Sequence, residues 1–574
     1  MSAQSEYRKW LESTVIDEGT RFRLVSMEHD EQAIEQCFSL PMQFGTAGLR
    51  STMDVGISHM NVYTVAQTTK GLADLVLQSN GAERGVAISY DSRINSELFA
   101  HTAAGVLAAN GVKVYLFDGM RPTPELSFAI LHHHCMAGIN ITASHNPKEY
   151  NGYKVYWEDG AQLPPEHAQI VSDIVAKTDI FSVKQVPLAE AIASGKVVFI
   201  GKETDEAFLS AVQGCSLSPD LVGKYGEGLH IVYTPLHGTG YRLVPEILKR
   251  QGIPNLITVA EQMIPDGRFP TVASPNPENT DCFALAAKKI ADEGISCNMI
   301  VASDPDADRI GLALRGDDGK FFALNGNQIG ALLIDYIIRV RKEKAVLPAN
   351  ACAIKSIVSA GLFDAICDAE GVSHISVLTG FKYIGEKIKQ WAESGEHTFI
   401  FGYEESQGYL SGGYARDKDA IAGTMLVVEM ACFHASHGKT VAGALNDLYE
   451  KYGYYRESVL NLAVKGTDPM ALMGARMAAL RKDGFAEIAG KKVVRVRDYK
   501  AGTVKDLATG TETPTGLPSS DVLYYELETG DNVIVRPSGT EPKIKVYLLA
   551  KADSDPAVKQ KLEEFSAFMK EKMA

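Results

Sequence analysis

Apolar and polar positions alternate along the chain in a way that predicts parallel β-sheets covered by helices. From residue 60 to 141, short apolar runs typical of buried strands (GVAISY, KVYLF, AGINIT) alternate with longer helix-like segments (ELFAHTAAGVLAAN, TPELSFAILHHH). Continuous apolar strands separated by helical segments are typical of parallel sheets that are covered on both faces. The same alternation returns at 229–313 and at 326–437. The sequence therefore predicts three successive α/β units.

The last part of the chain, from about residue 456, has a different pattern. Longer strand-like runs (ESVLNLAV, KKVVRVRDY, VLYYELE, NVIVRP, KIKVYLLAK) follow one another with few helical segments between them, and an amphipathic segment, VKQKLEEFSAFMKEKM, comes last. This pattern favours an antiparallel sheet with a helix, an α+β arrangement. We expect α/β domains at 1–205, 206–323 and 324–455, with mixed or parallel sheets, and an α+β domain at 456–574.

Composition and charge narrow the class of protein. Of the 574 residues, 45% are hydrophobic and 22% are charged, as in ordinary soluble proteins. No apolar run approaches the roughly 20 residues of a membrane span, and the eight cysteines form no CxxC pair. A net charge of -14 argues against binding to nucleic acids or anionic membranes, which needs a basic face. We expect a cytoplasmic protein that binds neither.

The first α/β unit carries a candidate nucleophile, Ser144, in the loop TASHNP after the strand AGINI. A serine hydroxyl becomes useful for covalent chemistry when neighbours handle its proton, and His145 stands directly beside it. Asn146 and Pro147 force a turn, so we expect Ser144 at an exposed strand end, where open α/β sheets bind ligands. A turn in which Ser144 only satisfies a backbone group is the alternative.

The second unit carries a candidate metal site in SDPDADR. Asp304, Asp306 and Asp308 follow the apolar strand NMIVAS at alternating positions. Three carboxylates so close together repel one another unless a cation neutralises them, and hard oxygen ligands suit Mg²⁺ or Ca²⁺. Because Mg²⁺ commonly completes its shell with phosphate oxygens, the loop predicts a phosphorylated partner. The alternative is a solvated acidic turn, which the apolar flanks on both sides disfavour.

Two further loops offer groups for a phosphate and for a sugar. RPSGTEPK supplies Arg536, Ser538, Thr540 and Lys543 as donors around Gly539, an anion cradle whose alternative is a charged hairpin turn. GYEESQGY places Glu404, Glu405 and Ser406 at the end of the strand HTFIF, where they would accept hydrogen bonds from sugar hydroxyls. Its alternative is the N-cap of a helix. Arg50 in FGTAGLR, Arg93 in YDSR and Lys382 in TGFKYIG are also near strand ends, although each alone is more often a surface charge.

Taken together, TASHNPKEYNGYKVY, SDPDADR, GYEESQGY and RPSGTEPK, in this order and spacing, resemble the α-D-phosphohexomutase superfamily over nearly the whole chain. The chain length, FGTAGLR, TGFKYIG and EESQGY are most similar to its long phosphoglucomutase and phosphopentomutase branch. The resemblance implies a heart-shaped enzyme of four domains around a central cleft, to which each domain contributes one of these loops.

The resemblance also implies roles for individual residues. Ser144 would be the phosphoserine, and its phosphate would join Asp304, Asp306 and Asp308 in holding one Mg²⁺ per chain. The substrate-binding residues would be Thr379, Gly380, Glu404 and Ser406 for the sugar and Arg536, Ser538, Gly539 and Thr540 for the phosphate that does not react. The transferring group would be surrounded by Arg50, His145 and Lys154, with Arg93 and Arg309 near the phosphate. Proton transfer would fall to Lys154, His145 or Lys382.

The implied activity is that of a phosphoglucomutase, an isomerase that acts by intramolecular phosphotransfer. Phospho-Ser144 would give its phosphate to the 6-hydroxyl of glucose 1-phosphate, and the 1-phosphate of the resulting glucose 1,6-bisphosphate would return to Ser144. Glucose 1,6-bisphosphate would thus be both intermediate and activator. Phosphopentomutase or phosphomannomutase activity is the main alternative, and a non-catalytic sugar-phosphate-binding protein is another. The implied partners are small sugar phosphates, with the chain as a monomer or homodimer.

Overall fold

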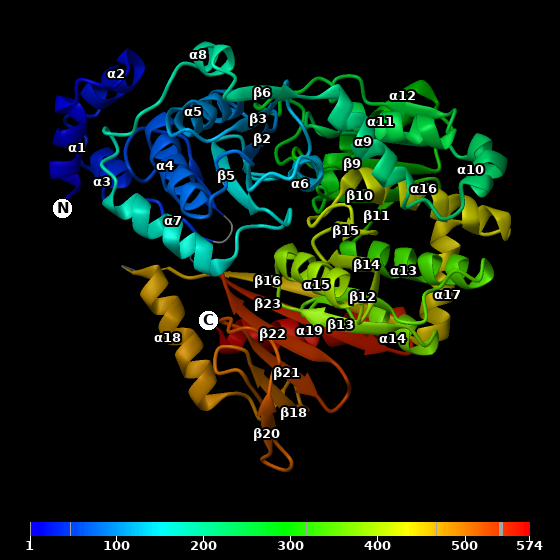
Figure 1. Cartoon of the computed structure of the whole chain (residues 1–574). Coiled ribbons are helices and arrows are strands. Elements are labelled where there is room, and N and C mark those ends of the chain that lie inside the picture. The colour runs from blue at the N-terminus through cyan, green and yellow to red at the C-terminus, as the bar shows by residue number, and fades with distance from the viewer. Residues whose placement is uncertain (1, 46–47, 317, 466–467, 539–542, 574) are drawn as a thin grey trace. The chain divides into compact units, whose positions relative to one another are not determined.

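The computed structural model describes residues 2–45, 48–316, 318–465, 468–538 and 543–573 (Figure 1). The chain divides into two compact units. Unit 1 consists of Met1–Gly326, Ile384–Gly402 and Ser406–Gly438. Unit 2 consists of Asn327–Tyr383, Tyr403–Glu405 and Lys439–Ala574. The four domain boundaries expected from the sequence stay a prediction.

Three short helices begin the chain: α1 (Ala3–Glu12), α2 (Glu18–Ser26) and α3 (Glu31–Phe38). Each starts at a polar cap, Ser2, Asp17 or Asp30, whose side chain accepts a backbone N–H of the first turn. Their apolar faces share a small core around Trp10 and Phe38. The alternation of apolar and polar positions described above does not predict these helices.

The first sheet of unit 1 has the strand order β1-β5-β4-β2-β3-β6. Its strands are β1 (Leu49–Thr52), β2 (Val86–Tyr90), β3 (Val114–Phe117), β4 (Ala137–Ile141), β5 (Tyr150–Trp157) and β6 (Val197–Ile200). The helices of this region are α4 (Val62–Gln78), α5 (Ser96–Ala109), α6 (Thr123–His132), α7 (Pro165–Lys177), α8 (Leu188–Ala193) and α9 (Lys202–Gln213). β2, β3, β4 and β6 run parallel, whereas β5 and β1 form an antiparallel edge. The predicted strands and helices are confirmed here.

The second sheet of unit 1 has the order β11-β10-β9-β7-β8. Its strands are β7 (Ile231–Thr234), β8 (Leu256–Thr258), β9 (Met299–Ser303), β10 (Ile310–Arg315) and β11 (Phe321–Leu324), and its helices are α10 (Pro219–Tyr225), α11 (Gly240–Gln251) and α12 (Ala284–Glu293). β7 pairs in parallel with β8 and β9, and β9 continues into an antiparallel hairpin with β10. Every residue of β9 is buried, which explains its continuous apolar sequence.

The third sheet has the order β13-β12-β14-β15, and its first two strands pair in parallel. The strands are β12 (Ala351–Ser356), β13 (Ser373–Val377), β14 (Thr398–Glu404) and β15 (Gly408–Leu410), and the helices are α13 (Gly326–Glu343), α14 (Leu362–Ala369), α15 (Phe381–Ser394), α16 (Ala420–Ser436) and α17 (Val441–Tyr452). Residues 420–434 of α16 are all buried, because this helix is apolar around its whole circumference.

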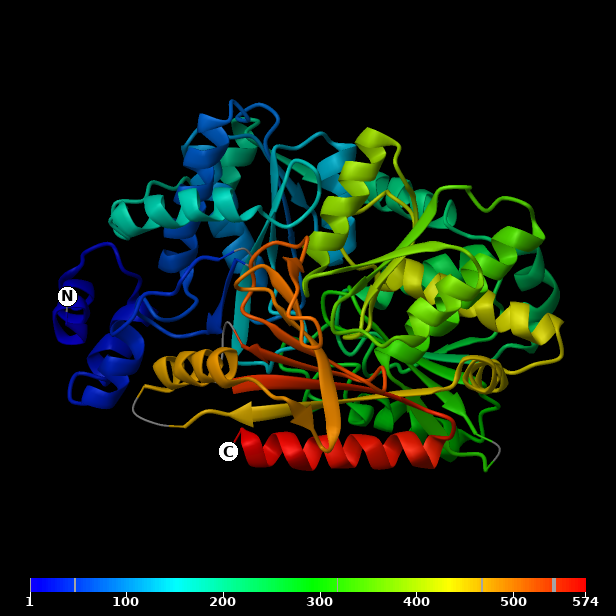
Figure 2. The ribbon, with the colours of Figure 1, turned by 90° about the horizontal axis from the view of Figure 1, so that it is seen from below.

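The C-terminal sheet of unit 2 is antiparallel, with the order β16-β23-β22-β21-β18-β19-β20 and β17 paired to β18. Its elements are β16 (Tyr454–Ala463), α18 (Pro469–Asp483), β17 (Glu487–Ile488), β18 (Lys491–Asp498), β19 (Thr503–Asp506), β20 (Glu512–Pro514), β21 (Leu523–Leu527), β22 (Asn532–Pro537), β23 (Lys543–Ala552) and α19 (Asp555–Lys572). α19 packs along the sheet through Phe565 and Met569 (Figure 2). The predicted α+β arrangement is confirmed.

Two further observations concern the whole chain. Its three tryptophans, Trp10, Trp157 and Trp391, are buried and all belong to unit 1. Among the residues that the structure describes, none of the helices combines the length and the apolar character that crossing a bilayer requires.

Candidate active site

Two hairpin loops of unit 1 bring the predicted nucleophile and the predicted metal ligands together. The first loop joins β4 to β5, and in this hairpin Asn140 lies opposite Lys154. The second joins β9 to β10, where Ser303 lies opposite Ile310 and residues 304–309 form the loop. Each loop leaves the carboxyl end of a buried strand, where α/β folds place their ligand-binding side chains.

Ser144 faces the aspartate loop. Its hydroxyl donates a hydrogen bond to Asp304 Oδ2 at 2.7 Å and lies 3.1 Å from His145 Nδ1. The backbone turn is made instead by Thr142, whose hydroxyl accepts the Ser144 N–H at 2.8 Å. The expectation of an exposed position was wrong, since Ser144 is only 3% exposed. The aspartate loop packs against it, and the sequence could not show that contact.

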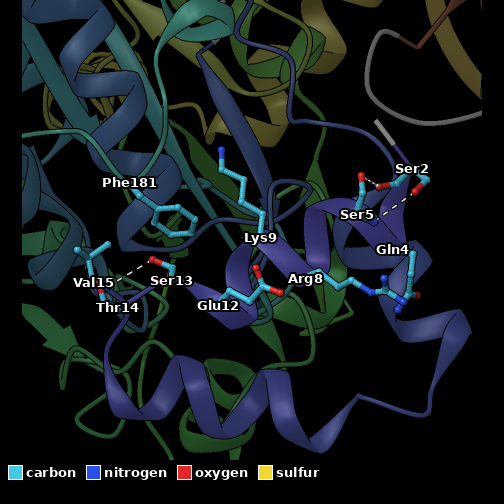
Figure 3. Close-up of a pocket in the computed structure, with 10 residues that line it drawn as sticks. All are labelled: Ser2, Gln4, Ser5, Arg8, Lys9, Glu12, Ser13, Thr14, Val15 and Phe181. Carbon is cyan, nitrogen blue, oxygen red and sulfur yellow. Dashed lines mark hydrogen bonds between the residues drawn. The ribbon is translucent and has the colours of Figure 1, made fainter.

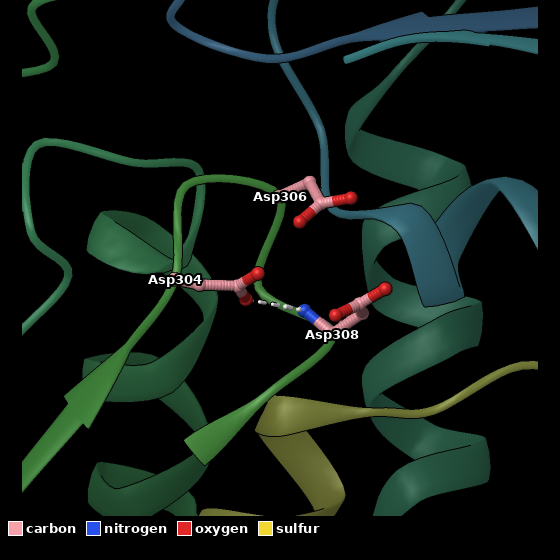
Figure 4. A group of neighbouring side chains, drawn as sticks. All are labelled: Asp304, Asp306 and Asp308. Carbon is pink, nitrogen blue, oxygen red and sulfur yellow. Dashed lines mark hydrogen bonds between the residues drawn. The ribbon is translucent and has the colours of Figure 1, made fainter. Parts of the chain in front are cut away.

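The three aspartates converge on one point (Figure 4). One carboxylate oxygen from each lies within 4.8 Å of the others, and all three side chains are buried. Asp304 Oδ1 is fixed by the backbone N–H groups of Asp308 and Arg309, at 3.1 and 3.0 Å. The loop thus points its carboxylates inward by using its own backbone as a donor.

The donor set fits a divalent metal ion. Asp306 Oδ1 and Asp308 Oδ1 are buried and have no hydrogen-bond partner. Buried polar atoms are rarely left without a partner, because an unsatisfied group costs about 1–3 kcal/mol. Two such oxygens beside a third carboxylate offer the hard ligands that Mg²⁺ prefers.

Burial and neighbouring charges shift the pKa values of the three carboxylates in different directions. Burial, and then repulsion from Asp306 and Asp308, raises the pKa of Asp304 well above its usual value. Burial would also raise the pKa of Asp306, but Lys154 Nζ, 2.8 Å from its Oδ2, lowers that pKa below the usual range. Burial and the neighbouring Asp306 raise the pKa of Asp308. The site therefore holds its negative charge most readily on Asp306.

Sequence reasoning missed two residues that touch this cluster. Lys418 Nζ lies 3.2 Å from Asp308 Oδ2, and the Thr123 hydroxyl donates to Asp306 Oδ2 at 2.8 Å. The sequence does carry a signal for Lys418, because the charged run RDKD stands directly before α16, which is apolar on all sides and so must be internal. For Thr123, at the start of α6, we see no comparable signal.

The side chain of Lys418 occupies space that is free only because residue 408 is a glycine, and this gives a first prediction. A Cβ added at Gly408 would lie 1.9 Å from Lys418 Cδ, so Gly408→Ala must displace the lysine side chain. We expect turnover to fall by about 100-fold, since small displacements of site groups cost that much. Overpacking should lower the free energy of unfolding by about 1–3 kcal/mol. Steady-state kinetics and thermal denaturation measure the two effects.

The matched control is Gly223→Ala, because Gly223 lies in α10 and a Cβ there meets nothing within 4 Å. This variant should keep both turnover and stability. If Gly408→Ala behaved like it, Lys418 would not depend on the space at residue 408.

The other predicted residues of unit 1 surround the same loops. Arg50, on β1, donates to Asn146 Oδ1 at 3.0 Å, and Arg309 Nε lies 3.6 Å from Asp308 Oδ1. Burial, and then the charges of Arg309 and Arg50, hold the pKa of His145 well below its usual value, which favours the neutral form of the imidazole. Arg93 donates to backbone carbonyls of the Ser144 loop rather than to side chains.

Unit 2 holds most of the residues predicted to contact the sugar. The Gly380 N–H donates to Glu404 Oε1 at 2.7 Å, which joins the TGFKYIG and GYEESQGY motifs. The Thr379 hydroxyl oxygen beside them is buried without a hydrogen-bond partner. Lys382 is the second residue of α15, and its Nζ lies 4.9 Å from the Tyr383 ring centroid. Ser406 belongs to unit 1, where the next residue's carbonyl accepts the Ile310 N–H at 3.1 Å.

The predicted phosphate cradle is described in part. Arg536 lies near the end of β22 opposite Lys545, and the Ser538 N–H donates to the Lys543 carbonyl at 2.9 Å. Burial, Glu405 and Glu404 raise the pKa of Tyr547, while Arg536 opposes this shift. Tyr547 therefore lies within electrostatic reach of both motifs in unit 2. Gly539 and Thr540 lie outside the described residues.

A surface pocket beside α1 does not coincide with these motifs (Figure 3). It is lined by Arg8, Lys9, Glu12 and Phe181, together with Ser2, Gln4, Ser5, Ser13, Thr14 and Val15. Lys9 is paired there with Asp179 at 3.1 Å. Because none of the predicted site residues lines this pocket, it does not compete with the loops described above.

Comparison with protein-family models finds four matches in succession. The models described as phosphoglucomutase/phosphomannomutase alpha/beta/alpha domains I, II and III match residues 41–180, 206–317 and 325–452. The model described as the phosphoglucomutase/phosphomannomutase C-terminal domain matches residues 472–567.

Curated relatives and solved structures agree with these models. The phosphoglucomutase of Staphylococcus epidermidis RP62A is 37% identical over 524 residues, 91% of this chain and 93% of the relative. That of Staphylococcus aureus USA300 is 35% identical over 548 residues, 94% and 95%. A putative phosphomannomutase of Thermus thermophilus superposes with a TM-score of 0.68 at 22% identity, over 93% of this chain and 99% of that one. Parafusin, a phosphoglucomutase of Paramecium, gives 0.67 at 16%, over 92% and 95%.

Proposed function

Because the chain belongs to the phosphoglucomutase/phosphomannomutase family, we propose that it interconverts glucose 1-phosphate and glucose 6-phosphate through phospho-Ser144. Its intermediate would be glucose 1,6-bisphosphate, which would also serve as activator. The observation that carries the proposal is the 2.7 Å hydrogen bond from the Ser144 hydroxyl to Asp304 in a buried carboxylate triplet. A serine oxygen so close to ligands for a divalent cation can carry a phosphoryl group whose charge needs neutralising.

The metal we propose is one Mg²⁺ per chain, held by Asp304, Asp306 and Asp308 with the phosphate on Ser144. The two buried oxygens without hydrogen-bond partners, on Asp306 and Asp308, support this choice. When bound, the ion would neutralise negative charge on the phosphoryl oxygens. Thr123 and Lys154 hold Asp306 Oδ2 on its other side, so they fix the direction in which Oδ1 points.

The residues around Ser144 would handle charge and protons during transfer. Arg50, Arg309 and Lys154 supply positive charge near the loop, as phosphoryl transfer requires. Among the candidates Lys154, His145 and Lys382, the neutral imidazole of His145 is supported by its 3.1 Å distance from Ser144 Oγ. Lys154 is occupied by Asp306, which supports an electrostatic part for that residue.

Unit 2 would recognise the substrate. Glu404, oriented through Oε1 by the Gly380 N–H, would accept hydrogen bonds from sugar hydroxyls. Thr379 offers a buried hydroxyl for the same purpose. Ser406, which belongs to unit 1, would add another. Arg536 and Ser538, with Gly539 and Thr540, would bind the phosphate that does not react. An arginine fork suits phosphate because it can donate two parallel hydrogen bonds.

The wider setting of the enzyme is also a proposal. We propose small sugar phosphates as its partners, a monomeric or homodimeric chain, and a cytoplasmic location. We also retain the domain boundaries 1–205, 206–323, 324–455 and 456–574, which the positions of the four family models support.

The test is turnover of glucose 1-phosphate, mannose 1-phosphate and ribose 1-phosphate in parallel, with Mg²⁺ and a trace of the matching bisphosphate. We expect the highest kcat/KM with glucose 1-phosphate. A higher value with ribose or mannose 1-phosphate would keep the chemistry and change the substrate, giving a phosphopentomutase or phosphomannomutase. No turnover with any of the three would refute the catalytic proposal in favour of a sugar-phosphate-binding protein.

A further inference from the structure

Arg93 has an unusual set of partners in the described structure. It follows β2 and is buried, and its Nη1 donates to the carbonyl oxygens of Pro147 and Tyr150, both at 2.9 Å. Its Nη2 donates to the carbonyl oxygens of Ser144, at 2.6 Å, and Asn146. One guanidinium group therefore binds four carbonyls of the loop that carries the proposed phosphoserine.

These contacts use the donors that a phosphate would need. A guanidinium has five N–H groups, four of them on the two Nη atoms. The four carbonyls account for the Nη hydrogens, while Nε faces Asp91 Oδ2 at 3.4 Å. Asp91 is itself fixed, because its Oδ1 accepts the Arg93 N–H at 2.9 Å and the Ser96 hydroxyl at 2.8 Å. The Ser144 loop thus uses all four Nη hydrogens of Arg93, while Nε is buried beside Asp91 without a hydrogen bond.

The loop has a conformation that needs such support. Ser144 has φ +53°, in the left-handed region that residues other than glycine rarely adopt. Four carbonyls of the loop turn toward Arg93, while the Ser144 Oγ meets Asp304. Strained positions of this kind persist when the surroundings over-determine them.

The loop 265–269, which precedes α12, also contacts Arg93. The side chain of Arg93 packs against this loop. Its guanidinium carbon lies 5.1 Å from the centroid of the Phe269 ring, in cation–π geometry. Nearby, Gly267 approaches so closely that a Cβ there would lie 2.4 Å from the Ile94 nitrogen. Arg93 is therefore held between the Ser144 loop and the loop 265–269.

We propose that Arg93 is a positioning residue that clamps the Ser144 loop so that Ser144 Oγ meets Asp304, without touching the transferring phosphoryl group. The inference rests on the role proposed for Ser144 and gives Arg93 a different part from the phosphate-proximal one that the sequence suggested. It explains why an arginine is needed, since a lysine offers three donors from a single point and cannot reach four separate carbonyls.

Arg93→Lys tests the clamp by two independent measurements. Hydrogen–deuterium exchange of the backbone amides in 142–150 should become about tenfold faster, because the loop opens more often. In steady-state kinetics, kcat should fall by about 100-fold while KM for glucose 1-phosphate changes little, because displacement of the reacting group affects the chemical step. A phosphate-binding arginine would instead change KM as well.

The matched control is Arg84→Lys. Arg84 also donates to two backbone carbonyls, those of His134 and Cys135, and to Glu158, but it lies away from the Ser144 loop. Its replacement should leave both the exchange of 142–150 and kcat within about twofold, as for most surface substitutions. An equal loss of kcat in the two variants would overturn the proposal, and so would unchanged exchange in a folded Arg93→Lys protein.

A milder variant decides the matter if Arg93→Lys does not fold. Phe269→Leu keeps the guanidinium and removes the aromatic face behind it, so exchange of 142–150 should quicken by about threefold or more. Unchanged exchange there would overturn the clamp. Since the exchange measurement needs no substrate, absence of mutase turnover in the unmodified protein would refute the proposed function and leave the clamp to be judged by exchange alone.

Discussion

Replacing Ser144 with alanine is expected to abolish the interconversion of glucose 1-phosphate and glucose 6-phosphate. The hydroxyl is the proposed carrier of the phosphoryl group, and no other route for the transfer remains when it is lost. We expect kcat to fall by a factor on the order of 10⁴ or more, as when a covalent nucleophile is removed. Coupled steady-state assays with saturating glucose 1,6-bisphosphate measure this loss.

Intact-mass measurement separates loss of the phosphoserine from loss of structure. After incubation with glucose 1,6-bisphosphate, the unmodified protein should carry one additional phosphate, and Ser144→Ala should carry none. Ser182→Ala, at an exposed serine on the same unit, should behave like the unmodified protein in both assays. Phosphorylation of Ser144→Ala to the same extent would place the phosphate on another residue.

Replacing Asp304 or Asp306 with asparagine is expected to remove the metal site. Each substitution takes away one of three converging carboxylates. Loss of a group that only orients a ligand already costs 10–100-fold in affinity, so loss of a ligand should weaken Mg²⁺ binding by about 100-fold or more. Turnover at a fixed Mg²⁺ concentration should fall accordingly. Isothermal titration with Mg²⁺ and steady-state kinetics measure the two effects.

The two variants should differ in the stability of the metal-free protein. The lowered pKa of Asp306 means that its charge stabilises the fold above the unfolded pKa, and this contribution is lost as pH falls through the folded pKa. At pH 7, Asp306→Asn should therefore lose about 1.5–3 kcal/mol, the range for hydrogen bonds to charged groups. The raised pKa of Asp304 means that its charge destabilises the fold at pH 7, so Asp304→Asn should unfold at the same or a higher temperature.

Thermal denaturation in the presence of a chelator measures this difference. Asp292→Asn is the control, because Asp292 is an exposed aspartate paired with Lys288 on α12, and its replacement should change neither metal binding nor stability. Equal destabilisation by Asp304→Asn and Asp306→Asn would contradict the division of charge described above. Undiminished Mg²⁺ affinity in either variant would remove that residue from the site.

Much of the fold could be predicted because buried parallel strands leave a strong pattern. β2 and β9 are buried along their whole length, so their sequences are almost entirely apolar and stand out from the helices around them. The antiparallel position of β5 was not evident. Its sequence, YNGYKVYW, is also buried from Asn151 onward, and the direction of a strand within a sheet leaves no mark in its sequence.

The candidate site could be predicted where its residues are neighbours in sequence. Asp304, Asp306 and Asp308 share one loop. Their mutual repulsion can be recognised from the sequence alone, and it predicts a bound cation. Lys418 stands 110 residues beyond Asp308, and only folding brings its ammonium to that carboxylate. The burial of Ser144 escaped prediction for the same reason, because the group that covers it comes from a different sheet.

The distribution of tryptophans between the two units determines what optical methods can report. Since Trp10, Trp157 and Trp391 all belong to unit 1, changes in indole fluorescence during denaturation follow that unit alone. Unit 2 contributes buried tyrosines such as Tyr336 and Tyr525, whose absorbance and near-ultraviolet dichroism carry its signal. A fluorescence melting curve therefore reports the unfolding of unit 1 only. Calorimetry is needed to observe the unfolding of both units.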